Sequence, residues 1–272
     1  MHTDAFTPSG IVTLTTDLGT RGPYVGVLHG VMLAQHPSAR IVDLTHEVEV
    51  HWPAEAGFWI ERAYQAFPRG TIHVAVVESL GGTDRAGVVV EHDGHVFVGP
   101  DNGLFGLLAE RDGATTYAIA SATVKRLTGR APSPTFRGRD VQGPVAGALA
   151  AGRLRLVEVG PRIDDWAPSL IEEPNRRDEA IEGLVVTVDG FGNVITNIPG
   201  DMLDRKGSSF VVVAGRRLPV RLSYGDTAPG QLLALLNAFD RLEIARAQGS
   251  AADALGVGRG APVRVERGPS ES

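Results

Sequence analysis

Short runs rich in valine and isoleucine alternate with helix-like segments through the first half of this 272-residue chain. We expect strands, each bounded by turn residues, at residues 11–15, 41–44, 72–77, 88–91 and 96–99. We expect helices at residues 24–35 and 54–67, with Pro53 suited to the first helical turn. Strands that alternate with helices predict a layered α/β domain with a mainly parallel sheet.

The second half of the chain has a different pattern. Residues 164–179 are polar, contain prolines and show no periodicity, which is typical of a linker. Beyond them we expect mostly strands, at residues 183–189, 194–197, 209–213, 216–222, 241–245 and 262–266, with one short helix near residues 251–255. These strands predict a smaller all-β domain, built as a barrel or sandwich.

The predicted domain boundaries follow from this change of pattern. We expect an N-terminal α/β domain at residues 1–165, a linker at 166–180, a C-terminal β domain at 181–267 and a disordered tail at 268–272.

Composition excludes several classes of protein. The net charge of -6 argues against a nucleic-acid partner, since phosphate contacts need a basic surface. The chain has no cysteine, which removes disulfides and cysteine metal sites and favours a cytoplasmic location. No apolar run approaches the roughly 18 residues of a membrane span, and no secretory signal is visible, so we expect no membrane partner.

Four polar islands stand in apolar, strand-like surroundings, at residues 15–20, 98–103, 136–140 and 188–193. Each contains glycine, which lets a backbone approach a ligand closely, and carboxylates or amides, which supply hydrogen bonds. Because loops that leave rigid strands often carry binding chemistry, the four islands together predict one composite small-molecule site.

Two of the islands allow specific interpretations. Asp17 ends a strand, and in open α/β sheets ligands bind beyond the carboxyl ends of the strands, so its carboxylate could accept both hydroxyls of a ribose. It could equally be a turn or N-cap residue. In the last island Phe191 could stack on a planar base and Asn193 could read its edge, or the segment could be a glycine-rich hairpin turn.

A metal or nucleotide cofactor is not expected. His92 and His95 surround the turn residues Asp93 and Gly94, and we interpret them as exposed hairpin histidines rather than metal ligands. No P-loop is present, and no G-x-G-x-x-G motif follows a strand.

Taken in order, five motifs resemble the S-adenosyl-L-methionine hydroxide adenosyltransferase family, which also contains the fluorinase and chlorinase. They are Thr-Thr-Asp-Leu-Gly-Thr at 15–20, Gly-Pro-Asp-Asn-Gly-Leu at 99–104, Thr-Phe-X-Gly-Arg-Asp at 135–140, Val-Asp-X-Phe-Gly-Asn-X-X-Thr-Asn-Ile at 188–198 and Leu-Glu-Ile-Ala at 242–245. The resemblance extends from Ile11 to about Val265.

The resemblance implies an α/β N-terminal domain, a β-rich C-terminal domain and a homotrimer, with the ligand between one subunit and its neighbour. S-adenosyl-L-methionine would be a substrate, and no cofactor would be needed. The implied substrate-binding residues are Asp17 for the ribose hydroxyls, Trp52 for the ribose and methionine, Asp189 for the methionine ammonium, and Phe191, Asn193 and Tyr224 for the adenine. Asn102 is a further candidate, and Arg246 matches a basic residue of the halogenase branch.

The chain departs from the family pattern where the reaction takes place. Hydrolytic members hold the attacking water with Asp, Arg and His, whereas the matching residues here are Glu78, Arg85 and Arg137. These three are the candidate catalytic residues. Glu78 could orient water and accept its proton, but Arg137 cannot accept a proton at any useful pH. Gly138 stands where the fluorinase has its halide-binding serine.

Three functions fit this altered centre. The chain could be an S-adenosyl-L-methionine hydrolase with Glu78 as the base. It could be an adenosyl transferase whose anionic nucleophile is recruited by Arg137, or a catalytically silent protein that binds the same nucleoside. We further predict that Glu78 and Arg137 form an ion pair, which would hold the pKa of Glu78 below its usual value.

Overall fold

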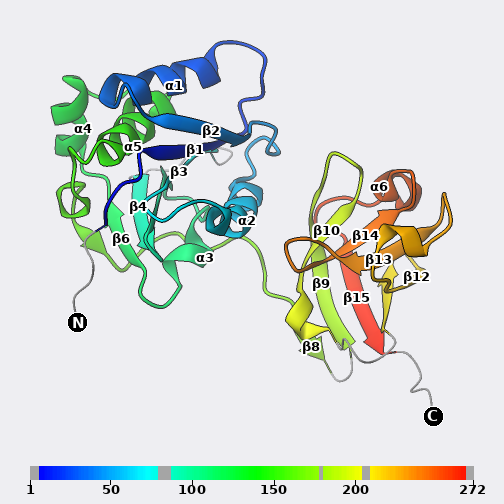
Figure 1. Cartoon of the computed structure of the whole chain (residues 1–272). Helices are drawn as coiled ribbons and strands as arrows, with labels where there is room; N and C mark the ends of the chain where they lie inside the picture. Colours follow the sequence, from blue (N-terminus) through cyan, green and yellow to red (C-terminus); the bar gives the residue numbers. More distant parts are fainter. Residues whose placement is uncertain (1–5, 79–86, 178–179, 204–208, 268–272) are drawn as a thin grey trace. The chain divides into compact units, whose positions relative to one another are not determined.

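The computed structural model describes residues 6–78, 87–177, 180–203 and 209–267. The chain divides into two compact units, Met1–Leu170 and Ile171–Ser272 (Figure 1).

The first unit is built on a seven-stranded sheet in the order β2-β1-β3-β5-β4-β6-β7. The strands are β1 (Ile11–Thr16), β2 (Arg40–Thr45), β3 (Ile72–Val76), β4 (Gly87–His92), β5 (His95–Pro100), β6 (Thr115–Ala118) and β7 (Arg162–Ile163). Strands β2, β1, β3 and β5 run parallel, and β4, β6 and β7 extend the sheet in antiparallel fashion. The chain therefore leaves β1, β3 and β5 at the same edge of the sheet.

Helices cover both faces of this sheet, which confirms the layered α/β prediction. They are α1 (Tyr24–Gln35), α2 (Pro53–Ala63), α3 (Gly106–Ala109), α4 (Ser121–Thr128) and α5 (Gly143–Ala150), with a π-helical turn η2 (Gly138–Gln142) that leads into α5. The core on one face is supplied by α1, α4 and α5, and the core on the other face by α2 and α3.

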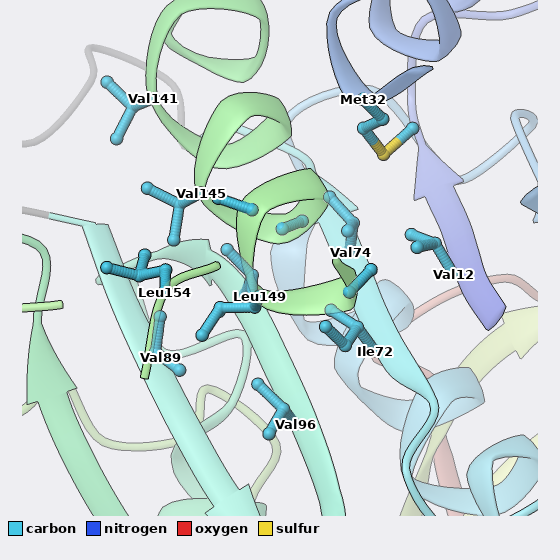
Figure 2. Packing of buried hydrophobic residues seen from close by; sticks show 14 of the residues in the cluster. Val12, Met32, Ile72, Val74, Val89, Val96, Val141, Val145, Leu149 and Leu154 are labelled. Carbon is cyan, nitrogen blue, oxygen red and sulfur yellow. The ribbon is translucent and has the colours of Figure 1, made fainter. Parts of the chain in front are cut away.

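Helix α5 is the centre of the larger core and was not predicted from the sequence. Every residue of α5 is buried, so the helix shows no amphipathic period. Figure 2 shows Val145 and Leu149 of this helix among residues of the same core, including Val74 of β3, Val96 of β5 and Met32 of α1.

The second unit is an antiparallel sheet in the order β12-β11-β15-β9-β10-β14-β13, with β8 paired to β9. Its elements are β8 (Asn175–Arg177), β9 (Ala180–Val188), β10 (Val194–Pro199), β11 (Ser209–Val213), β12 (Arg216–Pro219), β13 (Leu232–Leu236), β14 (Arg241–Arg246), α6 (Ala251–Leu255) and β15 (Pro262–Arg267). A bridge between Val220 and Ala234 joins the segment after β12 to β13, so the sheet nearly closes and confirms the barrel-like prediction.

Some elements differ from the sequence prediction. Strand β13 was not expected, because its five apolar residues do not alternate. Strand β8 lies inside the segment interpreted as a linker and pairs with β9. Strand β12 ends at Pro219, before the predicted end at residue 222.

The prediction that His95 is exposed was wrong. Its side chain is buried under the ring of Tyr64, with the two ring centroids 5.1 Å apart. His95 Nδ1 lies 3.1 Å from Nε2 of His73, whose Nδ1 lies 2.8 Å from the hydroxyl of Thr13. Burial lowers the pKa of His73 to about 3, with His95 adding to the effect, so this ring is neutral. Within the described residues no three potential ligands are grouped as a metal site would need.

None of the helices that the structure describes is both long enough and apolar enough to cross a lipid bilayer.

Candidate functional site

Three predicted site residues follow parallel strands of the first unit at one edge of the sheet. Asp17 follows β1, Glu78 follows β3 and Asn102 follows β5. Asn102 is buried, its Nδ2 donates to the carbonyl oxygen of Val77 at 3.0 Å, and its Oδ1 accepts from the Leu104 amide at 3.4 Å. Asn102 therefore ties the end of β3 to the loop after β5, next to Glu78.

His51 connects the first two of these strand ends, and sequence reasoning did not identify it. Its backbone amide donates to Oδ2 of Asp17 at 3.0 Å, and its ring Nδ1 donates to the carbonyl oxygen of Glu78 at 3.1 Å. The backbone of His51 has a φ of 63°, in the left-handed region that non-glycine residues adopt only rarely. The half-buried Trp52 follows directly and precedes α2, so this loop brings Trp52 to the same edge.

Arg137 and Asp17 lie close enough to Glu78 for their charges to affect its pKa. Burial raises the pKa of Glu78 above its ordinary value, the charge of Arg137 opposes that rise and the charge of Asp17 adds to it. The predicted lowering of this pKa was therefore wrong, because desolvation outweighs the neighbouring cation. Among the described residues Glu78 and Arg137 form no ion pair, although the charge of Arg137 still acts on Glu78.

The loop that carries Arg137 is held by the buried carboxylate of Asp140. Arg139 donates to both oxygens of Asp140, at 2.8 and 2.6 Å, and Arg130 donates to Oδ1 at 2.8 Å. The Ser133 amide donates to Oδ2 at 2.9 Å. The hydrogen bond from Arg139 is the largest cause of a pKa of about 2 for Asp140, so the carboxylate stays charged and the loop stays tied.

Gly138, the first residue of η2, allows this loop to pass close to β3. A Cβ atom at this position would lie 2.6 Å from Cγ1 of Val76. Arg85, the remaining candidate catalytic residue, lies outside the described residues.

In the second unit, Asp189 organises the turn between β9 and β10. Its Oδ1 accepts from the amides of Phe191 and Asn193, both at 2.9 Å, and its Oδ2 accepts from Nδ2 of Asn193 at 3.0 Å. Asn193 is buried, whereas 83% of Phe191 is exposed at the tip of the turn. The carboxylate thus shapes a turn that presents an uncovered aromatic ring, which suits stacking on a planar base.

Tyr224 contacts Glu243, a residue of the same unit that sequence reasoning did not identify. Its hydroxyl donates to Oε1 of Glu243 at 2.7 Å. Burial raises the pKa of Glu243, the hydrogen bond from Tyr224 opposes the rise and the charge of Asp189 adds to it. Glu243 could have been identified from the sequence as a carboxylate inside the apolar run 242–245. Arg246 ends the same strand, and its Nε donates to the carbonyl oxygen of Gly230 at 3.0 Å.

The predicted residues therefore gather into two groups, one in each unit. In the first unit Asp17 and Arg137 lie close enough to Glu78 to affect its pKa, and His51 connects Asp17 and Glu78 to the loop of Trp52. In the second unit Asp189 holds the turn of Phe191 and Asn193, and its charge reaches Tyr224. The first group contains a carboxylate whose pKa burial raises, as suits a proton acceptor, and the second offers an exposed aromatic ring and an amide, as suits nucleoside recognition.

Comparisons with known proteins agree with this division. Residues 12–160 match the S-adenosyl-L-methionine hydroxide adenosyltransferase N-terminal domain, and residues 183–264 match the C-terminal domain of the same family. The chain is 36% identical over 259 residues to an (R)-S-adenosyl-L-methionine hydrolase of Thermus thermophilus, covering 93% of this chain and 98% of the relative. A protein of the same name from Salinispora tropica is 34% identical over 264 residues, covering 96% and 99%.

A solved structure of an uncharacterised conserved protein from Thermotoga maritima is also similar to this chain. Its TM-score is 0.84 at 35% sequence identity, and the match covers 94% of this chain and all of that one.

Proposed function

Because the chain belongs to the S-adenosyl-L-methionine hydroxide adenosyltransferase family, we propose that it hydrolyses S-adenosyl-L-methionine to adenosine and L-methionine. The observation that carries this proposal is the similarity, over nearly the full length, to proteins named (R)-S-adenosyl-L-methionine hydrolase. The position of Glu78 and Asp17 beyond the ends of parallel strands supports it, since this is where ligands of open α/β sheets bind.

The reaction is a substitution at the ribose C5′. A bond forms between the water oxygen and C5′ while the bond from C5′ to sulfur breaks, and its electron pair leaves with the sulfur as neutral methionine. Catalysis of such a step is mainly orientation and removal of solvent, together with acceptance of one water proton.

Glu78 is the proton acceptor in this proposal. Burial raises its pKa, which makes the carboxylate a stronger base than an exposed glutamate. The ribose hydroxyls would be bound by Asp17, whose Oδ2 already accepts from His51. Arg137 and Arg85 would complete the surroundings of the water.

The substrate would reach residues of both units through a homotrimer. In this arrangement Phe191, Asn193 and Tyr224 of a neighbouring subunit surround the adenine, and Asp189 meets the methionine ammonium. Light scattering at micromolar concentration tests the assembly, and the mass of a monomer would contradict it. The absence of cysteine fits a cytoplasmic location.

The direct test of hydrolysis is to incubate the purified protein with S-adenosyl-L-methionine and measure adenosine by chromatography. We expect adenosine above a buffer control, and we expect Glu78→Gln to abolish its formation. Glu47→Gln is the matched control, because Glu47 is an exposed carboxylate of the same region. Saturable binding without adenosine would instead identify a silent binding protein.

One observation favours a second candidate, transfer of the adenosyl group to an anion. Arg137 is half-buried, and no described carboxylate lies within ion-pair distance of it, so it could hold an anionic nucleophile. If the protein is inert with water but forms a new adenosyl product with an added halide, transfer is the correct assignment.

The double variant Glu78→Asp plus Arg137→His tests whether the altered centre slows hydrolysis. It restores the residue types of the hydrolytic pattern and removes a permanent cation from beside a cationic substrate, so adenosine should form faster than in the parent. Each single change should help less, since the two positions are coupled. Arg40→His, at an exposed arginine, controls for the loss of one positive charge.

A further inference from the structure

A chain of polar side chains connects helix α1 to the turn that follows β1. His29 Nε2 lies 2.8 Å from Oδ1 of Asp43, and His46 Nε2 lies 3.3 Å from the same oxygen. The other ring nitrogen of His46, Nδ1, lies 2.9 Å from the hydroxyl of Thr16. That hydroxyl oxygen accepts from the backbone amide of Leu18 at 3.2 Å.

The hydrogen bonds of these groups differ in kind. A carboxylate only accepts, so His29 Nε2 donates to Asp43. His46 Nε2 lies near the same oxygen without making a hydrogen bond, and His46 is held through the bond between its Nδ1 and the Thr16 hydroxyl. The oxygen of that hydroxyl also accepts from the Leu18 amide.

Backbone hydrogen bonds join the same two segments. The Gly19 amide donates to the carbonyl oxygen of His46 at 2.8 Å, and the Val48 amide donates to that of Thr16 at 3.4 Å. Further along, the His51 amide donates to the side chain of Asp17 at 3.0 Å. The loop after β2 therefore holds the turn after β1 at three points in addition to the side-chain contact.

The inner end of the chain is buried and the outer end is accessible. Thr16 is completely buried and the His46 side chain is 8% exposed, whereas the side chains of Asp43 and His29 are 38% and 30% exposed. A hydrogen bond in the drier inner part gains strength from its surroundings, and losing one partner there leaves the other unsatisfied.

We propose that Thr16 and His46 are positioning residues that hold the turn bearing Asp17 in the conformation that receives the substrate's ribose. The identity of the ligand rests on the proposed function, whereas the order of the turn does not. A turn that is held before the ligand arrives loses less conformational freedom on binding.

The positioning role is tested with Thr16→Val, which keeps the shape but removes the hydroxyl. The affinity for adenosine, measured by calorimetry, should fall about tenfold, as expected for the loss of a buried hydrogen bond, and Thr16→Ser should regain most of it. Thr13→Val is the matched control, because Thr13 is a buried threonine of the same strand whose hydroxyl also contacts a histidine. Equal affinities for the Thr16→Val and Thr13→Val variants would overturn the proposal.

Amide hydrogen exchange separates this proposal from the proposed function. Exchange at Leu18, Gly19 and His51 should be faster in Thr16→Val than in the parent or in Thr13→Val. If the parent binds neither adenosine nor S-adenosyl-L-methionine, the proposed function fails, but faster exchange confined to Thr16→Val still supports the held turn. Unchanged exchange at these three amides would refute it.

Discussion

Mild acid should destabilise the first unit through the buried ring of His73. The ring is completely buried between Thr13, His95 and the edges of aromatic rings, and burial lowers its pKa from 6.5 to about 3. The unfolded chain therefore binds a proton at His73 between pH 6.5 and 3, whereas the folded chain does not. Stability that is present above pH 6.5 is lost as the pH falls below that value.

The magnitude follows from these two pKa values. A pH of 5 lies about 1.5 units below the pKa of the unfolded ring, so the unfolded ring is protonated, whereas the folded ring is still neutral. At about 1.4 kcal/mol for each unit, His73 alone should remove about 2 kcal/mol of unfolding free energy between pH 7.5 and pH 5. The pKa of His95 is also lowered by burial, so the parent protein should lose more unfolding free energy than the contribution of His73 alone.

Urea unfolding followed by tryptophan fluorescence measures this loss selectively. All three tryptophans, Trp52, Trp59 and Trp166, belong to the first unit. In His73→Gln the loss of unfolding free energy between pH 7.5 and pH 5 should be about 2 kcal/mol smaller than in the parent, whatever the variant's stability at pH 7.5. His36→Gln, at a half-buried histidine after α1, is the control and should keep the parental loss. Equal losses in the parent and His73→Gln would refute the reasoning.

Three further predictions concern the site. The rate of hydrolysis should rise with pH through a midpoint above the ordinary value of a glutamate, because burial raises the pKa of Glu78, and a profile flat from pH 4 to pH 8 would contradict this role. Asp17→Ala should weaken adenosine binding by about 1.5–3 kcal/mol in calorimetry, the cost of charged hydrogen bonds, and an unchanged affinity would make Asp17 a turn residue only. Tyr224→Phe should lower the stability of the second unit by about 1–3 kcal/mol in circular dichroism melts, since it removes the donor to the buried carboxylate of Glu243, and an unchanged melt would show that another donor replaces it.

The parts of the fold that could be predicted are those whose signal is local. Helices α1 and α6 have the predicted bounds, because residues at their ends mark where they start and stop: Pro23 for α1, and Ser250 and Gly256 for α6. The position of Asp17 and Glu78 at one edge follows from parallel strands alone. Helix α5 and strand β13 were missed, because complete burial removes the periodicity that distinguishes a helix from a strand.

The parts of the site that could not be predicted depend on contacts between distant residues. His51 acts through its backbone amide and a left-handed conformation, and neither can be recognised from the sequence. The direction of the Glu78 pKa shift was predicted wrongly, because the extent of burial decides it and the sequence shows only the neighbouring charge. His73 and His95 lie on neighbouring strands, so their buried contact can be predicted only when the order of the strands in the sheet is known.

The close approach of Gly138 to Val76 limits how this centre can change in evolution. Any side chain at position 138 would begin 2.6 Å from Cγ1 of Val76, a β-branched residue with little freedom to move away. A serine there, as the resemblance gives for the fluorinase, would therefore need a smaller residue at position 76 first. Glu78 and Arg137 can each be exchanged by a single mutation, whereas a hydroxyl at position 138 needs a second change at Val76, which would leave a cavity in the core.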